Sequence, residues 1–362
     1  MKYIFFVICI CPFFFACKNT LTDNNNTHVA KSFNRNDFIR TVSLKSSQKI
    51  EISEALNPYY CYLVKDSLVL LTNRDNVQEY KAGIYSLASG KLIREFGHKG
   101  NGPKEFISCS LDVRTNDSDI FYMEDVVQNK YWICSIDSLL ENNDFQLKEF
   151  TYSRDVIRLC PIGNKYIGYN FWYIKEDEYT NNVPKLQEYE MVSGPKGRLG
   201  TGYDYFVANV TGGYVFTNPD NRDVWVADFY EGKIDIYNDS LRLVKSLVGP
   251  DKFNHQYKLI EDKGCKFVYF AKGTSYRGYL CYTYTKNHVY LVYEGTNGTP
   301  YRMDNLKHVE IFKLDWNGNL LCNYQLDKHA FAISVDVKEE YLYACCFDSY
   351  EGEIEFIKYE LK

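Results

Sequence analysis

The sequence predicts an all-β fold: a six-bladed β-propeller with four-stranded antiparallel blades, whose ring is closed by an N-terminal strand. Aromatic residues make up 17% of the 362 residues, with 33 Tyr and 23 Phe, and such side chains favour the half-buried surface of a sheet. Apolar, strand-like runs recur along the chain with turn residues between them. No stretch has a long helical period, and the best helix candidate is the short segment 137–141.

The spacing of turn glycines indicates the length of the repeated unit. Gly90, Gly232 and Gly318 hold similar places in strand–turn–strand segments, and they lie three and then two steps of about 45 residues apart. Four-stranded propeller blades have about this length. A pair of β-sandwiches does not explain so regular a step, and β-helix repeats are much shorter. The chain from Ser67 onward therefore has room for about six blades with insertions.

Each unit combines an apolar strand, a strand that ends in Tyr or Phe, a turn with Gly or Asn, and a last strand. The first unit covers 67–106, and three glycines and a proline in its last segment, 94–106, predict a loop between two sheets. The strands expected in the later units lie at 119–123 and 130–135; at 157–160 and 165–169; at 223–228, 232–237 and 241–247; at 278–283, 288–293 and 309–314; and at 332–336, 341–346 and 354–360.

The N-terminus has the pattern of a signal peptide. An apolar run at 4–15, interrupted by Pro12, follows a short positive start and is too short for a membrane span of about 20 residues. The run ends in Ala16 and Cys17, which resembles the lipobox of bacterial lipoproteins. This resemblance implies cleavage before Cys17 and a lipid anchor on that residue. The alternative is an ordinary signal peptide with an incidental cysteine.

These features divide the chain into a signal peptide at 1–16, a lipidated cysteine with a polar tether at 17–36, and the propeller at 37–362. The last unit shows three strands before the chain stops, which would leave a sheet edge unpaired. A spare strand-like segment lies at 38–44, and another such pattern lies at 49–53. We therefore expect 38–44 to form the outer strand of the last blade and close the ring.

Several loop and turn segments resemble one known group of proteins. They are FGHKGNGPKEF at 96–106, VGPD at 248–251, LDWNGN at 314–319, and ISVD and LYA at 333–336 and 342–344. The chain is thereby similar to the six-bladed TolB-like β-propeller lipoproteins of outer-membrane bacteria, over nearly its whole mature length. The resemblance implies an exported six-bladed propeller, and it supplies no catalytic residues.

Composition argues against several classes of ligand. The net charge is −5 and no basic block occurs, so we expect no nucleic-acid partner. Nine cysteines remain after Cys17, with no zinc-type spacing, so we expect no metal site, and most should be small buried side chains, although one or two disulfides stay open. These cysteines are Cys61, Cys109, Cys134, Cys160, Cys265, Cys281, Cys322, Cys345 and Cys346. No cofactor motif or catalytic signature occurs, and no catalytic residue is assigned.

Three short segments are candidates for ligand binding. His98, Lys99 and Asn101 lie in the glycine-rich loop, where the backbone can approach an acidic group closely. The alternative for this loop is a plain connection between blades.

The other two segments combine aromatic faces with hydrogen-bonding groups. They contain Trp172 with Tyr173, and Tyr276 with Arg277, whose guanidinium could hold a carboxylate. The alternative for these residues is packing within and between blades.

The sequence thus predicts a lipid-anchored, non-enzymatic binding propeller at the bacterial cell envelope, which contacts a glycan, peptide or protein partner. Its membrane contact would be the anchor at Cys17, and we expect a monomer at the outer membrane, with the periplasmic or surface face left open. The alternative is a propeller hydrolase or lyase that acts at the central channel, since propellers host both kinds of function.

Overall fold

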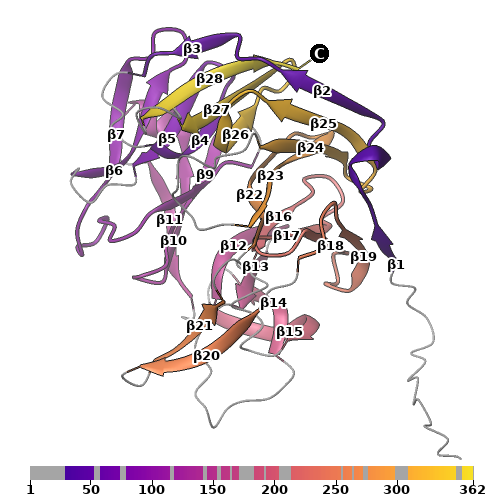
Figure 1. The fold of residues 1–362 in the computed structure, drawn as a ribbon. Helices are drawn as coiled ribbons and strands as arrows, with labels where there is room; N and C mark the ends of the chain where they lie inside the picture. Colours follow the sequence, from indigo (N-terminus) through magenta and orange to yellow (C-terminus); the bar gives the residue numbers. More distant parts are fainter. Residues whose placement is uncertain are drawn as a thin grey trace, which may run out of the picture.

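The structure, a computed structural model, consists of β-sheets arranged as a propeller (Figure 1). It describes the chain from residue 29 to residue 361 with internal gaps. The residues outside the description within that range are 53–57, 74–78, 115–117, 142–144, 153–155, 164, 171–182, 191–192, 204–212, 254–255, 263–264, 272–275, 298–308 and 348–352.

Three sheets form the first part of the propeller, and in each of them consecutive strands pair in an antiparallel manner. The first contains β4 (Pro58–Val64), β5 (Leu68–Asn73), β6 (Tyr80–Ser86) and β7 (Leu92–His98). The second contains β8 (Ser110–Asp112), β9 (Ile120–Asp125), β10 (Lys130–Ser135) and β11 (Gln146–Thr151), with α1 (Ile136–Glu141) after β10. The third contains β12 (Val156–Ile162), β13 (Lys165–Asn170), β14 (Val183–Glu190) and β15 (Ser193–Tyr203).

Three more sheets and a hairpin follow in the described residues. One sheet contains β16 (Gly213–Thr217), β17 (Val224–Asp228), β18 (Lys233–Tyr237) and β19 (Leu243–Val248). The hairpin pairs β20 (Tyr257–Asp262) with β21 (Cys265–Phe270). The next sheet contains β22 (Tyr276–Tyr284), β23 (His288–Asn297), β24 (Glu310–Asp315) and β25 (Leu320–Leu326). The last contains β26 (His329–Val335), β27 (Tyr341–Phe347) and β28 (Ile354–Glu360).

The first strand of each sheet lies on the inner side of the propeller. β26 packs beside both β22 and β4, so the last sheet meets the first. Leu63 on β4 donates its backbone N–H to the Ser334 hydroxyl on β26, at 2.9 Å. The predicted all-β propeller is therefore confirmed, and many of the expected strands and the short helix α1 lie close to their predicted places.

Two of the predicted turn glycines adopt a backbone conformation that favours glycine. Gly90 has φ +66° and Gly318 has φ +74°, in the left-handed region where a Cβ is disfavoured. At Gly90 a Cβ would also lie 1.7 Å from the backbone oxygen of Glu51. This turn is therefore fixed both by its own geometry and by the N-terminal segment that crosses it.

An N-terminal segment at 29–50, which we call the strap, runs along the outer edges of three sheets (Figure 1). β1 (Val29–Ser32) pairs in parallel with β19, and β2 (Arg40–Leu44) pairs in parallel with β25. β3 (Gln48–Ile50) pairs antiparallel with β28 as the fourth strand of the last sheet. Between β1 and β2, the short 3-10 helix Arg35–Asp37 lets Arg35 bind Asp251 and Glu310.

The strap corrects two details of the sequence analysis. The segment 38–44 was expected on the last sheet, but β2 pairs with β25 because Phe38 is buried there against Phe312, at a ring-centroid distance of 4.8 Å. The strand on the last sheet is instead 48–50. The range 17–36 was assigned to a tether, yet β1 and Arg35 lie within it, so residues 29–36 belong to the folded domain.

Aromatic and aliphatic side chains between the sheets form the core. The largest cluster spans the sheets of β16–β19, β22–β25 and β26–β28, with Trp225, Tyr290 and Tyr359 fully buried. Eight cysteine side chains are described, all with free thiols, and seven are buried. They behave as the small apolar side chains that the sequence predicted. No helix in the described ranges is long and apolar enough to cross a membrane.

Candidate functional site

A cavity of about 420 Å³ lies among the first strands of the sheets and forms the central channel of the propeller. All six first strands contribute to its wall. One lining residue from each strand, in chain order, is Tyr60, Leu111, Leu159, Tyr214, Tyr282 and Ile333. Because strands from six different sheets supply parts of the wall, the shape of this cavity depends on how those sheets pack rather than on one loop.

A second cavity of about 310 Å³ adjoins the first. Tyr59, Tyr60 and Tyr214 line both cavities, so the two spaces meet at these rings. Arg277 and His329 line the second cavity but not the first. Both volumes fall within the range of about 300–1,000 Å³ that is typical of small-molecule sites.

Tyrosine side chains dominate the polar surface of the central cavity. The Tyr62 hydroxyl donates to the Leu111 carbonyl at 2.5 Å, and the Tyr282 hydroxyl donates to the Asp112 carboxylate at 3.4 Å. Burial raises the pKa of both tyrosines well above the ordinary value, so their hydroxyls stay neutral. The wall thus offers flat rings and neutral hydroxyls.

Two carboxyl groups also face this cavity. Burial raises the pKa of Asp112, although Arg114 and the Tyr282 hydroxyl oppose the shift. Burial likewise raises the pKa of Glu124 to about 7, against hydrogen bonds from Tyr152 and from the backbone around Arg158. In both groups the loss of hydration outweighs the partners that favour the ionised form.

Glu124 links the second sheet to the third. Its Oε1 accepts hydrogen bonds from the Tyr152 hydroxyl at 2.8 Å and from the Arg158 backbone N–H at 3.0 Å. Its Oε2 lies 3.1 Å from the same N–H. The pairing of β12 with β13 shifts register between Ile157 and Cys160, so the carboxylate holds an irregular step of β12 in place.

Arg158 lies in that irregular step with φ +60°, an uncommon conformation for a residue with a side chain. Its guanidinium lies 4.5 Å from the centre of the Tyr214 ring and 4.3 Å from the centre of the Phe229 ring. Nη1 donates to the Gly213 carbonyl at 3.3 Å. The structure thus presents a cation between two aromatic rings on the wall of the central cavity.

The predicted ligand-binding residues fall into three groups: those at or beside the second cavity, those outside the described residues, and those of the loop at 98–101. Arg277 lines the second cavity, and its Nη1 lies 3.8 Å from Glu294 Oε2. The neighbouring Tyr276 stacks on Phe253, with ring centroids 4.9 Å apart. Trp172 and Tyr173 lie outside the described residues, as does Cys17.

His98 ends β7, and Lys99 and Asn101 lie in the connection to β8; none of the three lines either cavity. His98 contacts Glu79 at 3.0 Å and Glu105 at 3.4 Å. Lys99 donates its backbone N–H to Glu79, and the His98 carbonyl accepts from Phe106. These contacts organise the loop itself, and a ligand role for the three residues stays a prediction.

Sequence reasoning did not select Arg158 or Glu124 as site residues. Both lie in apolar strands, in VIRLCPI at 156–162 and IFYMED at 120–125. One sequence signal could have pointed to them: each is a charged residue between buried neighbours in a strand. Such a charge needs a partner or a ligand. Their meeting depends on the packing of two sheets, which local sequence does not specify.

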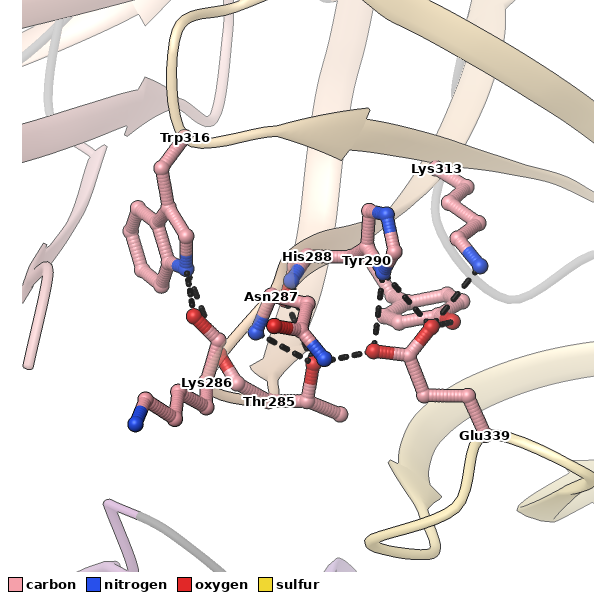
Figure 2. A network of polar contacts seen from close by, with 8 residues as sticks. All are labelled: Thr285, Lys286, Asn287, His288, Tyr290, Lys313, Trp316 and Glu339. Atoms are coloured by element: carbon pink, nitrogen blue, oxygen red, sulfur yellow. Dashed lines mark hydrogen bonds and ion pairs between the residues drawn. The ribbon is translucent and has the colours of Figure 1, made fainter.

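A second polar cluster lies between the sheet of β22–β25 and the sheet of β26–β28 (Figure 2). Glu339 Oε2 is 2.6 Å from His288 Nδ1, and it accepts hydrogen bonds from Tyr290 and Lys313, both at 2.8 Å. Thr285 donates to the other oxygen. Burial alone would raise the pKa of Glu339, but the bonds from His288 and Lys313 hold it well below the ordinary value. Every contact in this cluster joins protein groups, so it fastens two sheets together.

The described part of the chain shows no candidate metal-binding site. No group of three or more His, Cys, Asp or Glu side chains is placed there to hold an ion. The carboxyl groups that line the central cavity instead bind tyrosine hydroxyls and backbone N–H groups.

Comparisons with known proteins agree with this architecture. A protein of Bacteroides fragilis described as exported has 12% identity and a TM-score of 0.53, with 89% of this chain and 100% of that chain covered. A member of the DUF4221 family from Bacteroides vulgatus has 11% identity and a TM-score of 0.53, with 88% and 98% covered. At these identities the likeness concerns the fold.

No curated protein matches the sequence. A family model described as TolB-like 6-blade propeller-like matches residues 45–338, which is most of the chain. The match includes the first strands that line the central cavity. The chain therefore belongs to the TolB-like six-bladed propeller family.

Proposed function

We propose that this protein is a non-enzymatic binding propeller of the bacterial cell envelope, and that its central cavity takes a glycan, a peptide or part of a protein partner. The observation that carries the proposal is the cavity of about 420 Å³ that all six first strands line with tyrosine rings and neutral hydroxyls. Rigid walls of this kind suit recognition, because they need little ordering when a ligand binds.

The ring would consist of six blades, one for each sheet of four or five strands. β3 would complete the last blade, and its pairing with β28 supports this reading. Contacts between β26 and β4 support closure of the ring. In this arrangement the cavity is bounded on all sides, and a ligand enters from a face of the propeller.

The protein is anchored, in this proposal, by lipid on Cys17 at the outer membrane. The motif at Cys17 and the exported relative support the anchor. Cys17→Ser should abolish incorporation of labelled palmitate and move the protein from the membrane fraction to the soluble fraction. Undiminished labelling of the variant would contradict the anchor.

The test of the binding function is a screen of glycans and peptides with the mature chain carrying Cys17→Ser. Tyr59→Ala should weaken any hit about tenfold or more, because Tyr59 is 42% exposed and lines both cavities. Leu147→Ala, on the outer strand β11 and also exposed, is the matched control. A ligand that binds Tyr59→Ala and Leu147→Ala equally well would place the site elsewhere.

The enzymatic alternative has one observation in its favour, the pKa of about 7 at Glu124. Against it, the hydrogen bonds from Tyr152 and Arg158 already occupy this carboxyl group. Mass spectrometry of each hit after prolonged incubation decides between the two functions. Turnover that is lost in Glu124→Gln would establish the enzyme, and an unchanged ligand supports the binding function.

A further inference from the structure

We propose that the ligand of the central cavity is an acidic saccharide whose carboxylate binds Arg158, where the two cavities meet. This inference rests on the proposed binding function and gives it a ligand class. The guanidinium of Arg158 would hold the carboxylate through two parallel hydrogen bonds, and the tyrosine rings would receive the sugar ring.

The first argument is the state of Arg158 compared with other arginines. Arg35 binds the Asp251 carboxylate at 2.9 Å and Glu310 at 2.7 Å, so its charge is paired. Arg114 donates to the Pro161 carbonyl at 2.6 Å and contacts Cys160 Sγ at 3.1 Å. Arg158 has one carbonyl acceptor and no side-chain ion pair among the described residues. Most of its five N–H donors are therefore available to a ligand.

The second argument is position. Arg158 lines the central cavity, and its guanidinium lies against Tyr214, which lines both cavities. Arg277 lines the adjoining cavity, where Glu294 lies 3.8 Å from its guanidinium, so among the described residues the positive charge without an ion pair beside the shared rings is that of Arg158. An anionic group placed between Tyr60 and Tyr214 therefore meets positive charge.

The third argument is backbone strain. Arg158 is held in the left-handed region, which is unfavourable for a residue with a side chain, and strain of this kind concentrates at functional sites. Two oxygens of Glu124 fix the strained N–H. Glu124 is accordingly a positioning residue, because its bonds to the Arg158 backbone direct the guanidinium onto the cavity wall.

The chemistry of the remaining wall favours a saccharide over a peptide. Tyr59 and Tyr60 pack edge to face with centroids 4.5 Å apart, at the rim that both cavities share. Flat rings can stack on the apolar face of a pyranose, and the neutral hydroxyls of Tyr60 and Tyr282 can bond its hydroxyl groups. A peptide that binds as an added strand would call for an open sheet edge and separate pockets that receive alternate side chains.

The experiment measures binding of matched disaccharide pairs by calorimetry, with the mature chain carrying Cys17→Ser. Each pair contains glucuronate, galacturonate or mannuronate at one end, or the neutral parent hexose. We expect at least one acidic member to bind about 10- to 100-fold more tightly than its neutral parent. Arg158→Gln should reduce that ratio to near one, and Arg158→Lys should restore part of it.

Two further variants keep the proposal testable if the Arg158 substitutions fail to fold. Arg277→Gln should lower the acid-to-neutral ratio by a few fold, because Arg277 lies on the adjoining wall. Glu124→Gln should lower the ratio in a protein that stays folded by circular dichroism, which loss of structure would not do. Arg242→Gln, in the turn before β19, is the control and should leave the ratio unchanged.

The outcomes distinguish this inference from the proposed function. Equal binding of acidic and neutral members, unaffected by Arg158→Gln, overturns the carboxylate site but leaves a binding propeller. Binding of a tripeptide with a free C-terminus, weaker for its C-terminal amide, with no binding of any saccharide, overturns the saccharide assignment. No binding of any saccharide or peptide in the broader screen overturns the proposed function itself.

Discussion

Two buried glutamates show how the same residue type acts differently in two regions of this propeller. Glu124, beside the central cavity, receives hydrogen bonds from a tyrosine hydroxyl and a backbone N–H, and its pKa rises to about 7. Glu339, between two sheets, receives Lys313 and His288 as well, and its pKa falls. The partners of Glu124 do not offset the loss of hydration, whereas the hydrogen bonds that Glu339 receives from His288 and Lys313 do.

Each region also contains a charged residue with a positive φ, and the two charges point to different surroundings. Glu339 itself has φ +58°, and its charge is directed inward to Lys313 and His288 (Figure 2). Arg158 has φ +60°, and its charge faces the cavity. One strained charge therefore fastens two sheets, and the other is the one that we propose for ligand binding.

The largest expected effect concerns Glu339. Glu339→Gln should lower the free energy of unfolding by about 3 kcal/mol or more, because Lys313 and His288 would lose their anion in a largely buried site. Urea denaturation at pH 7 measures the change. Glu340→Gln, at the neighbouring exposed position, is the control. Equal stability of the two variants would mean that the cluster does not fasten the sheets.

The second effect is the pH dependence of Glu124. Its pKa is raised in the folded state, so its favourable contribution is complete below about pH 4.5 and is lost as pH rises through about 7. Glu124→Gln should therefore gain stability relative to the wild type between pH 5 and pH 8, by up to about 3 kcal/mol. Urea unfolding at both pH values measures this gain. A constant difference between the two proteins would refute the raised pKa.

Glu339 should show the reverse dependence, since its pKa is lowered in the folded state. Its stabilising contribution is complete above about pH 4.5 and is lost as pH falls further. The gap in unfolding free energy between wild type and Glu339→Gln should narrow from pH 7 to pH 3.5. A gap that widens on acidification would reverse the comparison of the two glutamates.

Arg35 provides a more exposed reference for the same ionic chemistry. Its side chain is 41% exposed, and it joins the strap to Asp251 and Glu310. Arg35→Met should lower the unfolding free energy by about 1 kcal/mol, because solvent screens an exposed ion pair. Addition of 0.5 M NaCl should shrink this difference more than it shrinks that of Glu339→Gln. Equal salt sensitivity would show that burial does not set the strength of these pairs.

The sequence was sufficient for features that depend on local pattern. Alternating apolar residues predicted strands such as β17 and β28, and turn glycines such as Gly90 marked the hairpins. The strap was harder, because 38–44 and 48–50 both read as strands and no local feature says which sheet each one joins. The placement of the strap depends on the packing of Phe38 against Phe312, which is far from it in the sequence.

Of the residues selected from the sequence, Arg277 lies on a cavity wall, whereas Arg158 and Glu124 were not selected. Arg277 was selected for its type. Arg158 and Glu124 become neighbours only when the second and third sheets pack, and the register shift in β12 sets the direction of Arg158. Contacts between sheets of this kind have no fixed spacing in sequence, so composition and periodicity do not reveal them.

The strap also fixes the order in which the chain can finish folding. Ser47 donates its hydroxyl to the backbone carbonyl of Lys358, which lies 311 positions later in the chain. A ribosome that adds roughly 5–20 residues per second needs about 15–60 s to cover that distance. During this interval Ser47 has been synthesised but its partner Lys358 has not. A chain interrupted before β28 leaves β3 unpaired, and quality-control factors that recognise an open strand edge can distinguish it from a finished molecule.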